Sequence, residues 1–518
     1  MCSGSRRKTA LGSLAPSNSQ TRCNKEPMTM CKRSYLFALS AVLGLLLTSA
    51  KLTAQGPCPP ADVQERPLAC FIPQAFGVTG FVDITQPFPD DFLARSLRPL
   101  SSSVARQAAL LPLASPSSGI TFSWNEEAKV FSASTDSFGP IFGERAETVG
   151  RHKALAAYNY QRIKFNAIDG IDLGRIPVVF TQPDITLTSF QPFGAKCSID
   201  GIQIPTPPPT FGVTNPDSYH SGGCAFIRNF IRMDNRIDLD VDQHTTFVTF
   251  GLTDRIDVSA AIPVERVRLT LSYDATIVLN GTPPNPQNPN SAQHFFPTRR
   301  DCPFPCLQRS DSIVGEASGI GDITLRIKGT AWKGERAGFA IGADVRIPSG
   351  DELNFLGSGA VGVRPFLIGS YHSRISPHFM VGYQVNGSSL IAGDIVEGTS
   401  ARLPSEFTYA AGADVWVTNW LTGAFDFIGE RVFQSGRIEM TTLSLPDACT
   451  TSGCPDSRST LESTITPSAG DLVISNASIG LKIRPLPNLL VTGHVLIRLN
   501  DSGLRADAVP LVGFSYTF

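Results

Sequence analysis

The sequence predicts an all-β protein, a transmembrane antiparallel up-and-down β-barrel of about 12 strands, with 14 strands as the alternative, and long extracellular loops. From about residue 153 onward, apolar and polar residues alternate in segments of 10–20 residues, which is the period of a β-strand. The connections between these segments are short and long in turn. The chain also begins with the pattern of an export signal and ends in a strand of alternating aromatic residues.

The composition excludes several classes of protein. Only 17% of the 518 residues are charged and 42% are hydrophobic, so the chain cannot supply the long apolar runs of a polytopic helical membrane protein. The 32 Phe residues can bury surface and argue against disorder. Residues 56–518 carry 36 Lys and Arg against 44 Asp and Glu, a net charge of −8, which argues against a nucleic-acid partner.

Residues 1–55 are predicted to be a signal peptide. The apolar run 35–50 follows Lys32 and Arg33 and is followed by small residues, the order of a secretory signal. The polar residues before Met28 suggest an upstream extension, with Met28 or Met30 as the true start. A single transmembrane anchor is the alternative, but the run is shorter than the roughly 20 residues that a span needs.

Twelve segments carry the strand pattern. They cover residues 153–166, 236–252, 255–278, 319–333, 337–350, 360–373, 376–390, 406–418, 421–433, 470–485, 489–500 and 509–518. In the fourth segment, for example, Leu325 and Ile327 share one face while Arg326 and Lys328 share the other. We therefore assign residues 153–518 to a transmembrane barrel with an apolar outer face.

Short links follow every second segment. They lie at 253–254, 334–336, 374–375, 419–420 and 486–488, and the other six connections have about 8 to 70 residues. Outer-membrane barrels have short turns on one side and long loops on the other. A soluble β-sandwich has no reason to separate loop lengths by parity, so this asymmetry is the strongest architectural signal in the sequence.

The Pro-, Ser- and Ala-rich residues 56–152 precede the barrel. They could plug the lumen from the periplasmic side or form a periplasmic linker. Alternatively, the apolar patches at 120–122 and 130–131 could supply two more strands, which is the origin of the 14-strand alternative.

Eight cysteines follow the predicted signal peptide as four local pairs. These are Cys58 and Cys70, Cys197 and Cys224, Cys302 and Cys306, and Cys449 and Cys454. Eight cysteines allow 105 connectivities, so the sequence cannot prove the pairing. Local disulfides are the simplest expectation in an oxidising compartment. Metal binding is less favoured because no second Cys or His pair with zinc-ligand spacing accompanies 302–306.

Charged residues of both signs fall on the polar faces of the segments and are predicted to line the lumen. They are Asp322, Arg326, Lys328, Asp344, Arg346, Arg364, Asp414, Asp426 and Glu430. They could create a transverse field across a wet pore, or pair with one another or with a plug, because burying them unpaired would be costly. We also interpret Asp238, Asp240 and Asp242 as a charged lumen strip.

The third segment predicts a bulge around Pro263. Its apolar residues are even-numbered up to Val264 and odd-numbered from Val267 onward. A period of two slips only where an extra residue is inserted, so we expect a bulge over 263–266, with Pro263, Glu265 and Arg266 at its centre. Such a bulge would be either a harmless irregularity at the membrane boundary or a lateral exit for an apolar solute.

The C-terminal residues 512–518 alternate aromatic and smaller residues and end in Phe518. Together with Gly513 and Tyr516, this ending resembles the C-terminal strand that outer-membrane insertion machinery reads. We therefore expect that machinery and outer-membrane lipid as partners, and the cell outer membrane as the location.

Several motifs resemble one outer-membrane transporter family. The stretches 319–325, 347–352 and 356–359, with weaker likeness at 144–150 and 273–276, look like the family labelled phenol-degradation (meta-pathway) proteins. That family is thought to be akin to FadL/TodX channels for hydrophobic compounds. The resemblance implies a channel in which a kinked strand releases apolar solutes sideways, and that is why we place a lateral exit at 263–266.

We found no nucleophile elbow, phosphate-binding loop, zinc-protease motif or dinucleotide fingerprint, so we expect no enzyme, no cofactor and no metal. The expected function is an outer-membrane channel for passive uptake or export of small, hydrophobic or aromatic molecules. The alternative is a structural or adhesive barrel that binds through disulfide-stapled extracellular loops.

Overall fold

The computed structural model describes residues 58, 66–73, 100, 103–108, 122–125, 130–133, 138–181, 197–199, 202–204, 230–278, 296, 300–303, 306–395, 397–446 and 459–518. The predicted signal peptide lies outside these residues, as do Cys224, Cys449 and Cys454. None of the helices among them is long and apolar enough to cross a membrane.

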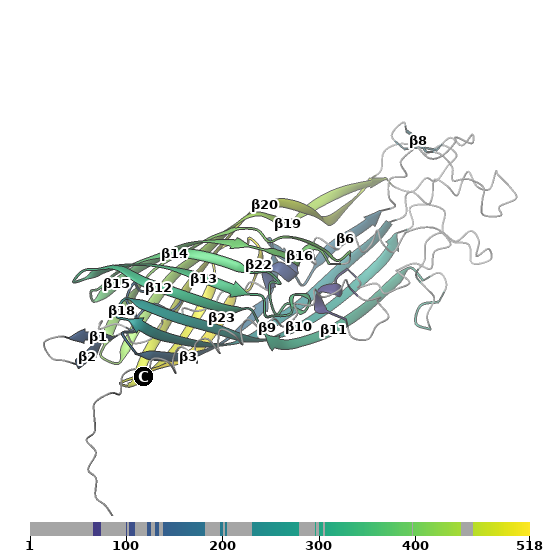
Figure 1. Ribbon diagram of the computed structural model, residues 1–518. Helices are drawn as coiled ribbons and strands as arrows, with labels where there is room; N and C mark the ends of the chain where they lie inside the picture. Colours follow the sequence, from purple (N-terminus) through teal and green to yellow (C-terminus); the bar gives the residue numbers. More distant parts are fainter. Residues whose placement is uncertain are drawn as a thin grey trace, which may run out of the picture. The chain divides into compact units, whose positions relative to one another are not determined.

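Twelve antiparallel strands form a closed barrel (Figure 1), as the sequence predicted. In barrel order they are β3 (Ala154–Phe165), β9 (Phe230–Thr253), β10 (Ile256–Val278), β12 (Ile323–Lys333), β13 (Ala337–Ile347), β14 (Gly362–Tyr371), β15 (Ile375–Asn386), β18 (Glu406–Thr418), β19 (Leu421–Pro446), β20 (Ser459–Leu486), β21 (Leu489–Arg498) and β23 (Ala508–Thr517). The last strand, β23, pairs with β3 and closes the sheet. A closed sheet satisfies its backbone groups internally, as a lipid environment requires.

The predicted parity of the connections is confirmed. Residues 254–255, 334–336, 372–374, 419–420 and 487–488 connect consecutive strands at one end of the barrel, which we call the tight-turn end. All longer connections lie at the opposite end, the long-loop end.

Smaller elements complete the fold. They are β1 (Phe122–Asn125) with β2 (Val130–Ala133), β4 (Ala167–Ile168) with β5 (Ile171–Asp172) and β22 (Leu504–Arg505), β6 (Ile176–Thr181), β7 (Cys197–Ile199) with β8 (Ile202–Ile204), β11 (Gln308–Ile320), β16 (Ser388–Asp394) with β17 (Thr399–Arg402), η1 (Leu68–Cys70) and η3 (Glu352–Asn354). Strands β1 and β2 pair only with each other, so the 14-strand alternative, in which this region adds strands to the barrel, is wrong.

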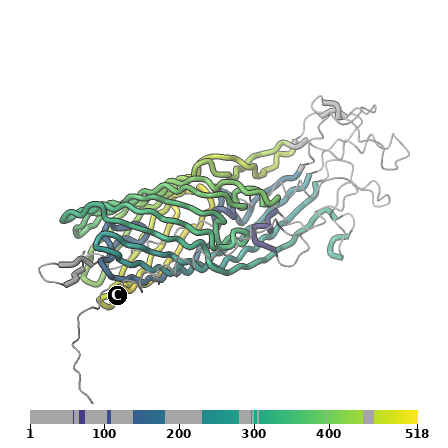
Figure 2. Tube along the Cα trace, viewed as in Figure 1, coloured from purple at the N-terminus to yellow at the C-terminus, as the bar shows by residue number. Residues whose placement is uncertain are grey.

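Some strands continue past the others at the long-loop end (Figures 1 and 2). Strands β6 and β11 pair with the far parts of β9 and β10, and β19 and β20 remain paired as far as Pro446 and Ser459. We call this region the extension: β6, β11, residues 230–242 and 266–278, and the far ends of β19 and β20. The remaining barrel strands, with residues 244–265, form what we call the membrane-level wall.

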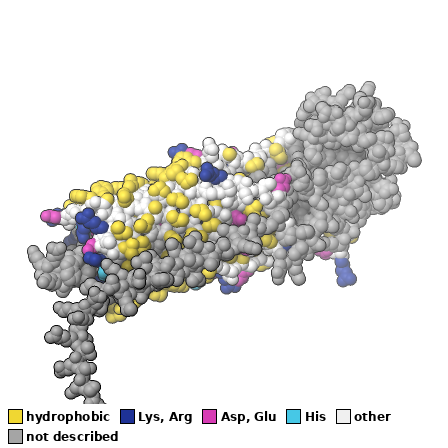
Figure 3. Space-filling model, viewed as in Figure 1, with side chains coloured by type: hydrophobic (Ala, Val, Ile, Leu, Met, Phe, Trp, Pro, Cys, Tyr) yellow, Lys and Arg dark blue, Asp and Glu magenta, His cyan; other side chains and the backbone are white. Residues whose placement is uncertain are grey.

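The outer face of the membrane-level wall is apolar (Figure 3). Large exposed side chains there include Phe250, Ile327, Ile341, Leu367, Phe379, Phe425, Ile479 and Phe514. Their neighbours along each strand point inward and are often polar or charged. An apolar band around a closed barrel with a polar interior is the structure of an outer-membrane protein, and the predicted location in the outer membrane is confirmed.

The extension has the opposite arrangement. In β9, Ile237, Leu239 and Val241 are buried, whereas the alternating acidic residues 238, 240 and 242 lie on the outer face. Interpreting Asp238, Asp240 and Asp242 as a lumen strip was therefore wrong. This part of the strand lies beyond the apolar band, so its apolar residues pack inward and its charges face water.

The predicted bulge at 263–266 is also wrong. Strand β10 pairs with β9 in one unbroken register from Asp257 to Val278, with Pro263 and Glu265 inside and Arg266 outside. The apolar residues change from even to odd because the strand leaves the apolar band, without any slip of the backbone. The lateral exit placed there loses its structural basis.

The irregularity lies instead in the strands that pair with β10. Strand β10 pairs with β12 up to Ala261, opposite Thr324, and with β11 from Val264, opposite Ile320. Two residues of β10 thus face the three residues 321–323, so the extra residue belongs to the junction of β11 and β12. The Gly321 N–H donates to the Pro263 carbonyl at 2.9 Å and connects this junction to β10.

Candidate functional site

All nine charged residues predicted to line the lumen lie on inner faces of their strands. They are Asp322, Arg326, Lys328, Asp344, Arg346, Arg364, Asp414, Asp426 and Glu430. The structure separates them into two groups. Lys328, Asp414 and Asp426 lie near the tight-turn end, and the other six surround a chamber deeper in the barrel.

Residues 138–150, which we call the inner segment, cross the barrel interior near the tight-turn end. Glu144 is buried and contacts both Arg326 and Lys328, with 3.0 Å between its Oε1 and the Lys328 Nζ. Arg145 reaches Asp414 on β18 at 2.5 Å. The charges of the inner segment are thus neutralised by charges on the barrel wall.

The backbone of the inner segment is also held by the wall. The Ile141 and Phe142 N–H groups each donate to Asp426 Oδ2 at 3.2 Å. Lys482 Nζ on β20 donates to the Pro140 carbonyl at 2.6 Å, and the Val149 N–H donates to Asp257 Oδ2 at 3.0 Å. An irregular segment inside a membrane barrel needs such partners, because an unsatisfied backbone group there costs several kcal/mol.

Sequence reasoning left several residues of this region out of the predicted site. Lys482 alternates with the apolar residues Leu481 and Ile483 of its strand, so the alternation could have identified it. His378, whose Nε2 lies 2.6 Å from Asp426 Oδ1, and Glu144 carry no local signal, because their partners are distant in the sequence.

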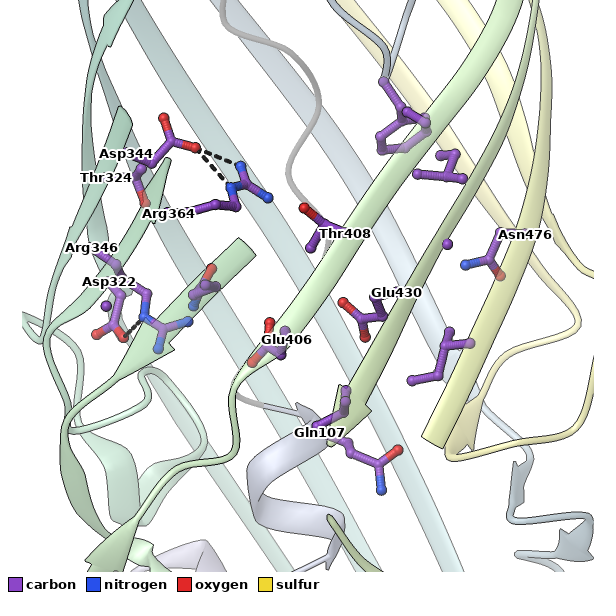
Figure 4. A pocket seen from close by; sticks show the side chains of 18 of the residues that line it. Gln107, Asp322, Thr324, Asp344, Arg346, Arg364, Glu406, Thr408, Glu430 and Asn476 are labelled. Carbon is purple, nitrogen blue, oxygen red and sulfur yellow. Dashed lines mark hydrogen bonds and ion pairs between the residues drawn. The ribbon is translucent and has the colours of Figure 1, made fainter. Parts of the chain in front are cut away.

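A chamber of about 310 Å³ lies inside the barrel (Figure 4). Phe142 of the inner segment lines it toward the tight-turn end, and Arg106 and Gln107 line it toward the long-loop end. One side is polar and is formed by β12–β15, β18 and β19. The other side is largely apolar and includes Ile163, Phe165, Phe247, Leu472, Leu496 and Val509, together with a few polar residues such as Gln243, Glu265 and Asn476.

The arginines of the polar side have acidic partners. Arg364 Nε donates to Asp344 Oδ2 at 3.0 Å, and the same carboxylate accepts from Arg326 at 2.6 and 2.9 Å. Arg346 Nε lies 3.6 Å from Asp322 Oδ2. Figure 4 shows the Asp344–Arg364 and Asp322–Arg346 pairs as dashed lines on the same side of the chamber.

Two carboxylates face the chamber from the adjacent strands β18 and β19. Glu430 was predicted, whereas Glu406, at the start of β18, was missed. Glu406 is 6% exposed and accepts a hydrogen bond from Asn386 Nδ2 at 3.3 Å. Figure 4 shows the two side chains near each other and directed into the chamber.

Two of the predicted cysteine pairs lie within the described residues. Cys58 is joined to Cys70 and Cys302 to Cys306, with Cα–Cα distances of 5.7 and 5.2 Å. Cys70 belongs to η1, whose neighbour Phe71 packs with Leu68 against Gly315 of β11 so closely that no side chain would fit there. The pairing of Cys197 with Cys224, and that of Cys449 with Cys454, stays a prediction.

The predicted assembly signal forms β23 and its end. Phe514, Tyr516 and Phe518 point outward into the apolar band, whereas Gly513 points inward against the Asn159 side chain. The Phe518 N–H donates to the Ala154 carbonyl at 2.7 Å and continues the seam with β3. Recognition of this strand by insertion machinery stays a prediction.

Among the described residues, no group of three or more His, Cys, Asp or Glu side chains could hold a metal ion. The side chains of Asp322, Asp344, Arg326, Arg346 and Arg364 near the chamber bind one another or the inner segment. The arrangement is that of a lumen with a charged side and an apolar side.

Comparisons with solved structures return membrane barrels at low similarity. An outer membrane channel from Pseudomonas putida F1 is 9% identical, with 72% of this chain and 98% of that chain covered and a TM-score of 0.39. A FadL homologue from Pseudomonas aeruginosa is 10% identical, with 71% and 89% covered and a TM-score of 0.27. A deletion mutant of the monoaromatic hydrocarbon channel TodX is 8% identical, with 71% and 90% covered and a TM-score of 0.26.

No curated protein matches the chain. A family model does match, and it covers residues 232–434, from β9 to the middle of β19. This range includes most of the motifs on which the resemblance was based. Over these residues the chain matches the family described as "Putative MetA-pathway of phenol degradation", as its motifs indicated.

Proposed function

We propose that the protein is an outer-membrane channel that takes up small hydrophobic or aromatic molecules. The observation that carries this proposal is the chamber, which has an apolar side inside a barrel whose outer face is embedded in lipid. Apolar surface around a cavity of this size favours a small apolar ligand over water. The described relative TodX is named for monoaromatic hydrocarbons, which agrees with a ligand of this kind.

The inner segment acts as a plug in this proposal. It is held near the tight-turn end by ion pairs of Glu144 and Arg145 and by hydrogen bonds from its backbone. A solute that crosses the lumen from end to end must displace it. Uptake therefore involves a movement of residues 138–150 that breaks these contacts.

The adhesive alternative is favoured by one observation, the packed core of the extension. Leu68, Phe71, Leu269 and Phe296 are buried together beyond the membrane-level wall. A solid extension suits loop-directed binding, because its packed core supports loops at the outer end of the barrel. In that case solutes would not enter the chamber at all.

The test fills the chamber with a larger side chain. Val509 lines the chamber, whereas Val512 on the same strand points into lipid. Val509→Trp should reduce the entry of a neutral aromatic such as toluene into cells to the level of cells without the protein. Val512→Trp should leave entry unchanged.

Heat-modifiable migration of both variants checks that the barrels fold. Equal entry with Val509→Trp and with the unaltered chain would refute passage through the chamber. No difference in entry between cells with and without the unaltered protein would favour the adhesive alternative. Release of preloaded solute from the same cells distinguishes export from uptake.

A further inference from the structure

A buried histidine connects two carboxylates that hold the inner segment. His378 projects inward from β15, and its Nε2 donates to Asp426 Oδ1 on β19 at 2.6 Å. Its Nδ1 lies 3.6 Å from Asp414 Oδ1 on β18. All three residues are buried, with exposed fractions of 4% or less. We call His378, Asp414 and Asp426 the histidine cluster.

Each carboxylate of the histidine cluster also binds the inner segment. The other oxygen of Asp426, Oδ2, accepts hydrogen bonds from the backbone N–H groups of residues 141–142. The other oxygen of Asp414, Oδ2, accepts from the Arg145 guanidinium. His378 thus faces one oxygen of each carboxylate, and the inner segment uses the second. A carboxylate that rotates away from His378 also moves its second oxygen away from the inner segment.

The contact between His378 and Asp426 depends on a glycine in the strand between them. In the sheet, His378 lies opposite Gly412 of β18, and Gly412 lies opposite Asp426. A Cβ at Gly412 would lie 2.7 Å from Asp426 Oδ1 and 2.9 Å from His378 Nε2. A side chain at this position would therefore separate the two groups, and glycine lets them meet across the width of one strand.

A second glycine places the inner segment directly against this pair. A Cβ at Gly143 would lie 2.6 Å from His378 Cδ2 and 3.0 Å from Asp426 Oδ1, so a side chain there would displace the inner segment or the imidazole. In the sequence, Gly143 lies between residues 141–142 and Arg145. The imidazole therefore packs against the middle of the stretch that the two carboxylates hold.

We propose that His378 is a positioning residue that keeps the inner segment in its closed position by fixing Asp414 and Asp426. This inference rests on the proposed function, in which residues 138–150 act as a plug, and it names the contact that controls their release. Without the imidazole both carboxylates are free to rotate. The hydrogen bonds that they accept from the inner segment then weaken together, and the plug opens.

The conductance of the purified full-length protein in planar lipid bilayers tests the proposal. His378→Phe keeps a buried aromatic ring but removes both ring nitrogens. A hydrogen bond to a charged group changes an equilibrium by about tenfold or more, so the fraction of time that the channel is open should increase about tenfold. His378→Lys supplies a new donor between the two carboxylates and should keep the channel as closed as in the unaltered chain.

His494→Gln is the matched control. His494 is also buried and meets the inner segment at the Phe142 ring, with 5.0 Å between the ring centroids, but its hydrogen bond is made with Ser478. This variant should leave the open fraction close to that of the unaltered chain. If His378→Phe does not yield a folded barrel, Gly143→Ala is measured instead. It alters no barrel strand, and its methyl group should push the inner segment away from His378 and raise the open fraction.

An open fraction that stays unchanged in His378→Phe, or in Gly143→Ala where the first variant does not fold, would overturn the proposal. Equal opening by His378→Phe and His378→Lys would also overturn it, because a donor at this position would then have no effect. Equal opening by His494→Gln would show a general loosening of the interior and have the same consequence. A channel that is fully open in the unaltered chain would instead contradict the plug of the proposed function, so the two failures are distinguishable.

Discussion

The membrane-level wall and the extension share β9 and β10, which turn the same face inward in both regions, but the apolar side chains lie on the outer face in the wall and on the inner face in the extension. Within β10, Val258 and Val264 face lipid while Asp257 and Glu265 are buried inside the barrel. A few residues further on, Leu269 is buried in the core of the extension while neighbouring Arg268 lies on the outside. The strand continues without a register shift between these regions, so the change lies only in what surrounds it.

The same outward-facing side chain stabilises the fold in one solvent, lipid or water, and destabilises it in the other. On the outer face of a barrel in lipid an apolar residue is stable and a charge is costly, whereas above the membrane a charge is hydrated and an apolar residue gains by burial. The ion pairs follow this rule. Glu144 contacts Lys328 inside the membrane-level wall, and Glu316 contacts Arg266 on the outer face of the extension.

The largest effect should come from placing a charge in the core of the extension. Leu269 is 0% exposed, so Leu269→Asp would bury an unpaired carboxylate and should cost about 4 kcal/mol or more. Ser272→Asp, on the outer face of the same strand and opposite Arg236, should cost almost nothing. Urea unfolding and protease resistance of the extension measure the difference, and equal values would contradict the inverted arrangement.

A charge on the lipid face should have the next largest effect. Ile327, in the middle of β12, is 52% exposed, and Ile327→Arg should destabilise the protein in lipid vesicles by about 2–4 kcal/mol. Val314 on β11 is 71% exposed but belongs to the extension, where Val314→Arg should be tolerated. A similar loss at both positions would place β11 within the membrane.

The junction between the two regions can be tested by adding a single methyl group. At Gly321 a Cβ would lie 3.0 Å from Pro263 Cγ and 3.1 Å from the Leu356 carbonyl oxygen. Gly321→Ala should therefore cost about 1–3 kcal/mol through overpacking. Pro263→Ala should cost about 1 kcal/mol or less. A larger loss of unfolding free energy for Pro263→Ala than for Gly321→Ala would show that the irregularity belongs to β10.

The smallest effect is expected at the outer ion pair of the extension. Glu316 and Arg266 are both exposed to water, and water and salt replace much of such an interaction. Glu316→Gln should leave the unfolding midpoint in vesicles unchanged, whereas Glu144→Gln should lower it because Lys328 and Arg326 stay buried. Equal shifts would show that the interior charges are as hydrated as those outside.

Local periodicity was sufficient to predict the barrel and its strands. Residues such as Leu325 and Arg326 alternate over a period of two, and loop lengths alternate along the chain, so both signals can be read within short windows. They correctly indicated twelve strands, the tight-turn end and the inward side of all nine charged residues. These features depend only on the identity of neighbouring residues and on the presence of lipid.

The tertiary structure decided which environment each part of a strand meets and which distant groups come together. After Val264 the apolar residues of β10 change from even to odd positions. From the sequence alone this change indicates a bulge, because the sequence does not show where the apolar band ends. Glu144 and Lys328 are separated by 184 residues, and the residues around each of them do not indicate that the two side chains meet. Likewise, Glu430 lies beside Glu406 because β18 and β19 pair in the register that places Glu430 opposite Thr408.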